Sequence, residues 1–373
     1  MKLHPFRLER YFARHEFSAP YLLCASDCES MEIGDLLALE PDAHDRFMSL
    51  SMGYTDSRGD PGLRHGIAGL YEDMGADRIL AHSGAEEAIF NFMNVALEPG
   101  DHIIVHAPFY QSLGEVARGV GAGVSEWRGD PNRGWEPDIE VLKRSLTPRT
   151  RVVVVNFPHN PTGFLPSPAF ARELSALSDA HGFVIFSDEV YRGLELDPSR
   201  RLPAFADLNP RAVSLGVMSK TYGLAGLRIG WVATRNDALF RELAAFKDYT
   251  TICASAPGEF LATLALRHGE AIAARNLHII RENLDRLDLF FDSHADLFRW
   301  RRPEAGSIAF PTLLKGDADE FCADLLEKAG VLLLPGSLYG PGLNSFRIGF
   351  GRKNLPGALD RFEDYLQATQ KGS

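Results

Sequence analysis

The chain has 373 residues with 45% hydrophobic and 24% charged side chains, which are ordinary globular proportions, and its length predicts about two domains in one compact body. Its 39 Lys and Arg against 50 Asp and Glu give a net charge of −11, which argues against a nonspecific nucleic-acid binder, because a phosphate backbone is held by clustered basic side chains. The sequence contains no basic run and no Pro/Ser-rich tail, so an intrinsically disordered chain is not expected either.

The N-terminal segment opens on charged and polar residues with no apolar stretch behind them, so we expect no secretory signal. The longest uninterrupted apolar runs, such as 152–155 and 331–334, are far shorter than the roughly 20 residues that span a bilayer, and we expect no membrane segment. The four cysteines are too few and too scattered for a disulfide framework, and no second Cys or His pair stands at zinc-ligand spacing. We therefore expect a cytoplasmic protein without a metal site.

Short, continuous apolar runs recur along the middle of the chain, each followed by a stretch with helical spacing. The runs predict strands at 102–106, 152–156, 183–187, 213–218 and 229–233. Because they are often β-branched and do not alternate with polar residues, they are typical of strands buried on both faces of a mostly parallel sheet. The intervening spacing predicts helices at 86–96, 168–181, 237–246 (with Asp237 as N-cap) and 259–268. The alternation predicts a doubly wound α/β layer from about residue 50 to about residue 280.

The C-terminal part of the sequence changes to an α+β pattern. It predicts a long helix at 275–291, strands at 307–310, 331–334 and 346–350, and helices at 318–329 and 356–369. We therefore expect an α/β fold with a mostly parallel, doubly wound sheet in a large domain, residues 46–285. A smaller α+β domain is expected to be built from both chain termini, residues 1–45 and 286–373.

A lysine closely follows the run 213–218 and leads into a glycine-rich turn. Lys220, at the end of a buried strand, can be partly desolvated, which lowers the pKa of its amine and lets it act as a nucleophile or Schiff-base former. Arg228, farther along the turn, offers the planar fork that suits a phosphate. The alternative is a solvated surface lysine and a structural arginine, which usually holds for an arbitrary lysine.

Two more predicted strands end on polar residues. Asp188 follows the run 183–187, where open α/β sheets bind their ligands, although an Asp at this place can equally cap a helix. The segment 156–163 follows another strand, and its two prolines and glycine make it a rigid turn. It is either a turn and nothing more, or it holds the Asn160 amide in fixed geometry beside a ligand.

Small residues open the predicted helix 86–96. Ser83, Gly84 and Ala85 would let the backbone N–H groups of a helix N-terminus, Glu86 included, approach an anion, and an ordinary capped helix start is the alternative. A cluster of three glycines within 119–123 has the wrong spacing for a dinucleotide site and precedes a predicted strand, so that interpretation is rejected.

Six short motifs occur in one order along nearly the whole chain. They are Ser83-Gly84-Ala85, Pro108-Phe109-Tyr110, Asn160-Pro161-Thr162-Gly163, Asp188-Glu189-Val190-Tyr191, Ser219-Lys220 with Arg228, and Phe346-Arg347-Ile348-Gly349. Each motif alone is weak, but the ordered series resembles the fold-type I pyridoxal-phosphate enzymes, specifically the class I/II aminotransferases. The resemblance implies pyridoxal 5′-phosphate as the cofactor.

The resemblance also implies a role for each residue around the cofactor ring. Lys220 would form the internal aldimine and then shuttle the proton between the substrate Cα and the cofactor C4′. Asp188 would pair with the pyridine nitrogen and keep it protonated, which makes the ring a better electron sink. Asn160 and Tyr191 would donate hydrogen bonds to the 3′-oxygen, and Tyr110 would stack on the ring face. The catalytic residues are then Lys220, Asp188 and Tyr191.

The same resemblance implies a phosphate site. Its members would be the N–H groups of Gly84, Ala85 and Glu86, the Arg228 guanidinium and the Ser219 hydroxyl. Many relatives carry Ser or Thr three residues before the lysine, where this chain has Val217, and Ala85 also stands where some relatives have a hydroxyl. The phosphate is therefore expected to depend more on backbone groups and on the arginine.

Two further residues match family positions. Tyr54 resembles the tyrosine that family members extend into the phosphate site of the neighbouring subunit, which implies a homodimer; the alternative is a buried core tyrosine. Arg347 matches the arginine that binds the substrate α-carboxylate, and the resemblance implies Asn160 as a second substrate-binding residue. The alternative, an arginine on an exposed strand, is disfavoured by the apolar Phe346 and Ile348 on either side.

Enzymes with this motif set catalyse several reactions, so the fold does not decide the chemistry. A carboxylate clamp at Arg347 disfavours α-decarboxylation, and we expect an aminotransferase that moves an amino group from an L-amino acid to a 2-oxo acid. The stretches 24–30 and 246–253 resemble capreomycidine-synthase-like enzymes, which makes a cyclase or lyase acting on an arginine-like amino acid the alternative. Asp27 and Glu29 would then meet the cationic side chain, or else they form a helix cap and a solvated face.

A non-catalytic pyridoxal-phosphate-binding protein is a further alternative. Regulators of that kind carry an added basic DNA-binding segment, which this sequence does not show, and the set Lys220, Asp188 and Arg347 favours catalysis. No second guanidinium can be assigned to a side-chain carboxylate, so dicarboxylate substrates are not predicted.

Overall fold

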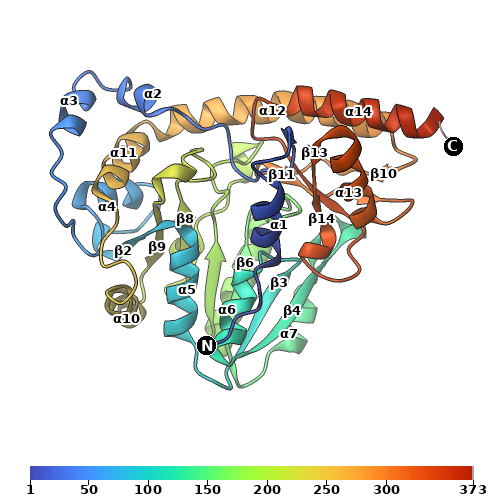
Figure 1. The fold of residues 1–373 in the computed structure, drawn as a ribbon. Helices are drawn as coiled ribbons and strands as arrows, with labels where there is room; N and C mark the ends of the chain where they lie inside the picture. Colours follow the sequence, from blue (N-terminus) through green and yellow to red (C-terminus); the bar gives the residue numbers. More distant parts are fainter. Residues whose placement is uncertain (372–373) are drawn as a thin grey trace.

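An eight-stranded sheet crosses the centre of the computed structural model, which describes residues 1–371 (Figure 1). In spatial order its strands are β2 (Ile79–His82), β9 (Gly230–Thr234), β8 (Val213–Val217), β7 (Val184–Asp188), β6 (Thr150–Asn156), β3 (His102–Ala107), β4 (Gly123–Asp130) and β5 (Glu136–Pro137). The pairs from β8 to β4 are parallel, whereas β9 is antiparallel to both of its neighbours and β5 is antiparallel to β4. The predicted mostly parallel sheet is confirmed, because its five predicted strands coincide with β3, β6, β7, β8 and β9.

Side chains of the central strands alternate between two apolar cores, as expected for a sheet covered on both faces. Ile103 and Val105 of β3 belong to the core that includes α5 (Gly84–Ala96), whereas Ile104 belongs to the core that includes α8 (Pro168–His181). The continuous apolar strands of the sequence therefore follow from burial on both sides. The other helices of this part are α4 (Pro61–Ala68), α6 (Ser112–Val120), α7 (Ile139–Ser145), α9 (Phe205–Leu208), α10 (Asp237–Lys247) and α11 (Ala256–Arg267).

Several helices begin earlier than predicted, among them α5, which begins at Gly84 rather than 86, and one predicted N-cap is wrong. The N-cap of α10 is Asn236, whose side chain accepts a hydrogen bond from Leu239 N (3.2 Å), so the predicted cap at Asp237 is wrong by one residue. Helix α11 begins at Ala256 rather than 259, because the Ser255 hydroxyl caps it. The helix predicted at 275–291 is longer in the structure, where α12 spans Gly269–Ser293.

The two ends of the chain pack together beside α12 (Figure 1). The N-terminal elements are α1 (Arg7–His15), β1 (Tyr21–Leu22), α2 (Ile33–Leu37) and α3 (Ala43–Met48); the C-terminal ones are β10 (Phe298–Arg299), β11 (Ile308–Ala309), β12 (Thr312–Leu313), α13 (Ala318–Ala329), β13 (Val331–Leu332), β14 (Leu334–Pro335), β15 (Phe346–Gly349) and α14 (Leu355–Lys371). Strand β1 pairs in parallel with β13, and β15 lies between β11 and β14. The predicted strand 331–334 is thus divided between two sheets. The division into domains 1–45, 46–285 and 286–373 stays a prediction, and its last two residues lie outside the described chain.

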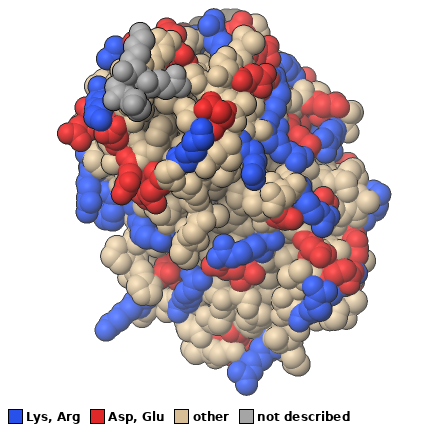
Figure 2. All heavy atoms as spheres, turned by 90° about the vertical axis from the view of Figure 1, so that its right-hand side faces the viewer, with Lys and Arg blue, Asp and Glu red and all other residues tan. Residues whose placement is uncertain are grey.

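The surface beside the C-terminal elements carries both signs of charge. Figure 2 shows Lys and Arg interspersed with Asp and Glu on this face. Among the residues of α12 and the C-terminal elements, Arg302 forms an ion pair with Asp285, and Lys328 forms one with Asp324. Within residues 1–371, the structure contains no helix that is both long enough and apolar enough to cross a bilayer.

Candidate active site

The carboxyl ends of β6 and β7 are tied together by one asparagine. Asn156 lies opposite Asp188 in the parallel register, and its Nδ2 donates a hydrogen bond to the Asp188 backbone oxygen (2.8 Å). The Asn156 Oδ1 accepts a hydrogen bond from Asn160 N (2.7 Å). The turn that carries Asn160 is therefore held directly above the end of the strand that carries Asp188.

Lys220 and Asp188 influence each other's ionisation. The Lys220 Nζ donates to Ser26 Oγ (2.8 Å), and burial lowers the pKa of its ammonium group, while Asp27 and Asp188 oppose this shift. Asp188 is only 6% exposed, and burial raises its pKa from 3.8 to about 7 against the opposing charge of Lys220. The Lys220 amine and the Asp188 carboxyl thus lie in the same site, close enough for each to shift the pKa of the other.

Tyr191 brings a buried hydroxyl into the same site. Its side chain is 1% exposed, and burial raises its pKa while the nearby Ser26 hydroxyl lowers it. Among the described residues, none lies at ordinary hydrogen-bond distance and angle from its Oη. A buried hydroxyl without a partner is costly, so this group is a donor that lacks its acceptor.

A tyrosine that follows β14 connects Asn160 to Arg347. Arg347, on β15, is 2% exposed; its Nε and Nη2 donate to the Cys24 backbone oxygen (3.1 and 2.8 Å), and its Nη1 donates to Tyr339 Oη (2.8 Å). A guanidinium can only donate, so the Tyr339 hydrogen goes to Asn160 Oδ1 (2.9 Å). The Asn160 amide nitrogen is then left as a donor. Nη1 and Nη2 each keep one N–H without a described partner, which is the donor pair that a carboxylate accepts.

The start of α5 forms a close cup with Arg228. A Cβ on Gly230 would lie 2.7 Å from the Gly84 carbonyl carbon and 2.9 Å from Ala85 N, and a Cβ on Gly84, whose φ is +81°, would lie 2.5 Å from Arg228 Nη2. Only glycines allow this approach of β9 and the guanidinium to the helix. The Ser83 side chain does not cap α5, so the first N–H groups of the helix have no capping partner. A positively charged side chain and a bare helix N-terminus together form an anion site.

Two residues beside Lys220 border this cup. Ser219 is half-buried and its hydroxyl makes no hydrogen bond with another described residue, whereas Val217 is 4% exposed at the end of β8. Among the predicted phosphate-site residues next to Lys220, Ser219 therefore supplies the hydroxyl that Val217 lacks.

Glu86 and Tyr110 lie beneath the N-terminal helix. The Glu86 carboxylate accepts a hydrogen bond from Ser112 Oγ (3.1 Å), and burial raises its pKa to about 7. The Tyr110 hydroxyl donates to Glu9 Oε1 (3.3 Å) on α1, and its ring centroid lies 5.0 Å from that of Phe6. The N-terminal segment thus covers the side of the site where Tyr110 and Glu86 meet.

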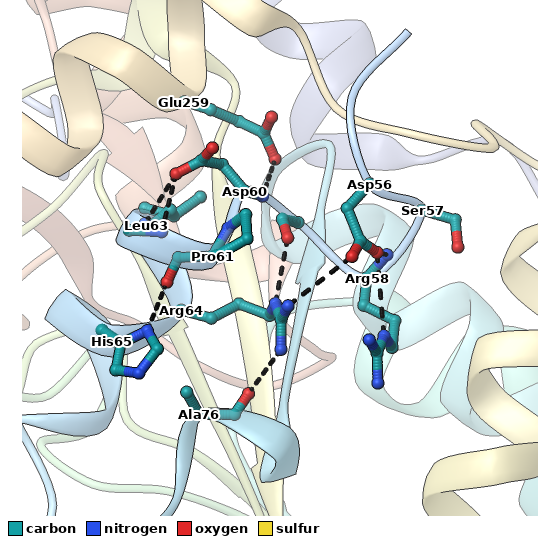
Figure 3. Close-up of polar contacts among 12 residues, drawn as sticks. Asp56, Ser57, Arg58, Asp60, Pro61, Leu63, Arg64, His65, Ala76 and Glu259 are labelled. Carbon is teal, nitrogen blue, oxygen red and sulfur yellow. Dashed lines mark hydrogen bonds and ion pairs between the residues drawn. The ribbon is translucent and has the colours of Figure 1, made fainter.

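Tyr54 is not a core residue, because 90% of its surface is exposed. The chain just after it is anchored firmly (Figure 3). Asp60 caps α4 and donates its N–H to Glu259 Oε1 (3.0 Å), and the Arg64 Nε donates to the Gly59 backbone oxygen (2.9 Å). Tyr54 therefore extends into solvent from a rigid base.

Asp27 and Glu29 already have partners within the chain. The Asp27 carboxylate accepts two hydrogen bonds from Arg352 (2.9 and 2.8 Å), and Glu29 Oε2 accepts one from Lys353 N (2.9 Å). Neither residue caps a helix, since α2 follows a different N-cap residue. These contacts favour a structural role for both carboxylates.

Three polar residues of this site were not predicted from the sequence: Ser26, Tyr339 and Glu9. Ser26 lies in an N-terminal stretch without regular structure, and Tyr339 follows a short 3-10 turn (Gly336–Leu338). Both reach partners far away in the sequence, so no local pattern marks them. The Pro-Gly turn before Tyr339 is the only local signal for a fixed loop at this place.

Comparison with known proteins identifies the family to which the chain belongs. The model of aminotransferase class I and II matches residues 23–362. The chain belongs to the class I and II aminotransferases. It is 32% identical over 370 residues to a capreomycidine synthase from Streptomyces vinaceus, covering 98% of this chain and 94% of that protein.

Two solved structures share the whole fold. A PLP-dependent aminotransferase from Streptococcus suis 89-1591 superposes with a TM-score of 0.93 at 32% identity, covering 99% of each chain. The PLP-dependent cyclase OrfR has a TM-score of 0.89 at 31% identity, covering 99% of this chain and 98% of its own. The predicted fold class and family are confirmed.

Pyridoxal phosphate is the cofactor that this family membership implies. The described residues fit it: the anion cup at Arg228, the unpaired Tyr191 hydroxyl and the desolvated Asp188 beside Lys220 match its phosphate, oxygen and ring nitrogen. Within residues 1–371, no group of three or more His, Cys, Asp or Glu is placed to hold a metal ion.

The raised pKa of Asp188 predicts how the cofactor-free protein responds to pH. The carboxyl binds its proton more tightly when folded, so its contribution to stability is complete below pH 3.8 and is lost as pH rises to about 7. We expect Asp188→Asn to become more stable relative to wild type over this window, by at most about 1.4 kcal/mol per pH unit. Urea unfolding of both proteins near pH 5 and pH 8 measures this, with the exposed Asp292→Asn as matched control. A pH-independent difference would contradict the assigned burial.

Proposed function

We propose that the chain is a pyridoxal-phosphate-dependent aminotransferase that transfers an amino group from an L-amino acid to a 2-oxo acid. The single observation that carries the proposal is the convergence of Lys220, Asp188 and Arg347 on one desolvated site. The family model and the aminotransferase from Streptococcus suis support the same activity.

The residues around the ring have separate tasks in this proposal. When bound, pyridoxal phosphate supplies the electron sink that stabilises negative charge at the substrate α-carbon. Lys220 holds the cofactor, and its lowered pKa favours the neutral amine that takes the proton from that carbon. Asp188 pairs with the ring nitrogen, and Asn160 and Tyr191 donate to the 3′-oxygen. Tyr110 stacks on the ring face in this proposal.

Arg347 orients the substrate. Its two free N–H groups bind the α-carboxylate, while Cys24 O and Tyr339 hold the guanidinium in place. A carboxylate bound in this way is retained, which disfavours α-decarboxylation. The Cα–H bond can then be set perpendicular to the ring for proton removal by Lys220.

The phosphate is held from two sides. The N–H groups of Gly84, Ala85 and Glu86, the Arg228 guanidinium and the Ser219 hydroxyl bind it within one subunit. Tyr54 reaches it from the partner in a homodimer. The exposure of Tyr54, together with that of Met52 (78%) and Tyr249 (90%), supports an interface at this surface.

A cyclase or lyase acting on an arginine-like amino acid is the second candidate. It is favoured by the likeness to a capreomycidine synthase and to a protein described as a PLP-dependent cyclase. Asp27 and Glu29 are engaged by other groups, so a cationic substrate side chain would instead meet Glu86 or Glu9 near Tyr110. The two candidates share the residues around the ring and differ in the chemical step after proton removal.

A substrate screen separates the candidates. We expect keto-acid release from at least one common amino donor with 2-oxoglutarate or pyruvate as acceptor. Consumption of an arginine-like amino acid without keto-acid release would favour the cyclase or lyase, and binding of the cofactor with no turnover of any substrate would favour a non-catalytic protein.

Lys220→Ala tests the covalent role of the lysine. Removal of the amine is expected to abolish cofactor attachment after borohydride reduction, measured by mass spectrometry of the intact chain. Transfer activity should fall by about 10³-fold or more, because both the covalent link and the base are lost. Attached cofactor in this variant would refute the assignment of Lys220.

Glu86→Gln tests the acidic wall of the site. If a cationic side chain binds there, this variant raises KM for arginine-like substrates by about tenfold, the size of one charge-assisted hydrogen bond, and leaves KM for neutral donors unchanged. An equal effect on both substrate types would contradict a role in recognising a cation.

Tyr339→Phe tests how the carboxylate arginine is held. The variant removes the hydroxyl that accepts a hydrogen bond from Arg347 Nη1 and donates one to Asn160 Oδ1. The KM for amino acids should therefore rise about tenfold, while cofactor attachment to Lys220 persists. Tyr365→Phe, which removes a hydroxyl bonded to Asp324 on the α13–α14 side, is the matched control. An unchanged KM would show that Arg347 is held by Cys24 alone.

A further inference from the structure

A buried ammonium group lies at the end of α10, away from the reacting lysine. Lys247 is 1% exposed, and its Nζ donates to the backbone oxygens of Ser57 and Ile252, both at 2.8 Å. Burial lowers its pKa, and both of these hydrogen-bond partners are neutral carbonyls. The nearby carboxylates of Glu87 and Glu259 oppose this shift, so they compensate the buried charge without a direct hydrogen bond to it. The hydrogen bonds of the ammonium group are thus left to join two backbone oxygens from different parts of the chain.

The two carbonyls belong to two separate loops. Ser57 lies in the segment that follows Tyr54, and Ile252 lies in the loop between α10 and α11. Ile252 has a φ of +62°, a left-handed conformation that a β-branched residue rarely adopts. The Lys247 ammonium therefore holds a strained carbonyl and the Tyr54 segment at one point.

The same two loops are joined elsewhere. Thr55 Oγ1 donates to Ala254 O (3.3 Å), and Asp60 N donates to Glu259 Oε1 (3.0 Å), as Figure 3 shows for the second contact. Lys247 is the charged donor of this set, and its partner Ser57 lies between Thr55 and Asp60 in the sequence. The position of residues 55–60 relative to the body is thus set by contacts with Lys247 of α10, with the α10–α11 loop and with α11, in addition to those with Arg64 of α4.

Both loops present exposed side chains on the surface next to this anchor. Tyr54 and Tyr249 are each 90% exposed, and Ile252 is 50% exposed. The backbone of these loops is held by the buried Lys247 ammonium, whereas their large side chains are mostly exposed within one subunit. This combination is typical of a surface that binds a second copy of the chain.

We propose that Lys247 is a positioning residue for the cofactor site of the neighbouring subunit, because it fixes the base from which Tyr54 extends to that site. The inference rests on the proposed homodimer with Tyr54 at the partner's phosphate. Lys247 touches neither substrate nor cofactor in this arrangement; it acts through Ser57 on the placement of Tyr54.

A route within the same subunit competes with this one. Thr250 and Thr251, next to the Lys247 loop, both donate to Glu87 Oε1, and Glu87 Oε2 accepts from Ser83 N at the start of α5. If Lys247 acted along this route, its loss would weaken the phosphate site of its own subunit. The two routes predict opposite results in mixed dimers.

Two hybrid dimers with differently tagged chains distinguish the routes. In the first, a Lys220→Ala chain is paired with a Lys247→Met chain, so the one site able to attach cofactor receives Tyr54 from a subunit with intact Lys247. In the second, a Lys220→Ala/Lys247→Met chain is paired with a wild-type chain, so that site receives Tyr54 from the altered subunit. The readout is the dissociation constant for pyridoxal phosphate, from covalent attachment to Lys220 at graded cofactor concentrations.

We expect wild-type affinity in the first hybrid. The second hybrid and the Lys247→Met homodimer should bind the cofactor about tenfold more weakly, the size expected for one hydrogen bond to a charged group. The reverse pattern, or equal weakening of both hybrids, overturns the proposal. Lys328→Met, which removes an exposed lysine on α13, is the matched control and should leave the affinity unchanged.

Tyr54→Phe in the same two arrangements separates this inference from the function on which it rests. If Tyr54→Phe does not weaken the partner's site, the proposed dimer is wrong; if it does and Lys247→Met does not, only the role of Lys247 is wrong. Lys247→Gln, which keeps one donor, repeats the test. Failure of both Lys247 variants to form folded dimers also overturns the proposal, because it would make the residue a general stabiliser.

Discussion

The burial of Asp188 beside the partly buried Lys220 is the constraint on which the site depends. Burial raises the pKa of Asp188 to about 7, and the hydrogen bond from Val190 N and the charge of Lys220 oppose this rise. Both groups can be held there only because parallel strands end at the same edge of the sheet, where Asn156 satisfies the backbone that would otherwise be left unpaired. In the proposed function, the ring nitrogen of the cofactor would give this carboxylate a cationic partner.

The fold was largely predictable where burial is symmetric. The strands β3, β6, β7, β8 and β9 are apolar on both faces, so their composition alone marks them as strands. Their order in the sheet was not predicted, because it depends on pairing between segments that are far apart in the chain. The prediction was weaker where short elements depend on distant partners. The run 331–334 is one apolar stretch in the sequence, but its halves pair with β1 and β15, which no local pattern specifies. The short helices α2 and α3 have too few turns to show periodicity.

Some residues of the candidate site could be predicted from the sequence and others could not, for the same reason. Residues in contiguous motifs, such as Asp188 and Lys220, could be named because strand ends position them. Tyr339 and Ser26 could not, since their roles arise from single hydrogen bonds between segments far apart in the chain. Tyr339 matters because a guanidinium can only donate, which fixes the hydrogen of the phenol and hence the orientation of the Asn160 amide. The amide nitrogen remains available only because three segments meet at this phenol, and no local sequence pattern specifies such a meeting.

Glu86 shows how one carboxyl can fit two kinds of substrate. Burial raises its pKa to about 7, and an anion bound at the nearby Arg228 would raise it further, which favours the protonated form and lessens repulsion of a phosphate. A cationic substrate side chain at Tyr110 would act in the opposite direction and favour the ionised form. Deprotonation of Glu86 costs free energy, which reduces the net attraction for the cation. Binding of a cation at Glu86 should therefore depend on pH more strongly than binding at an exposed carboxylate. The carboxylates of Asp27 and Glu29 are instead engaged by Arg352 and by the backbone N–H of Lys353.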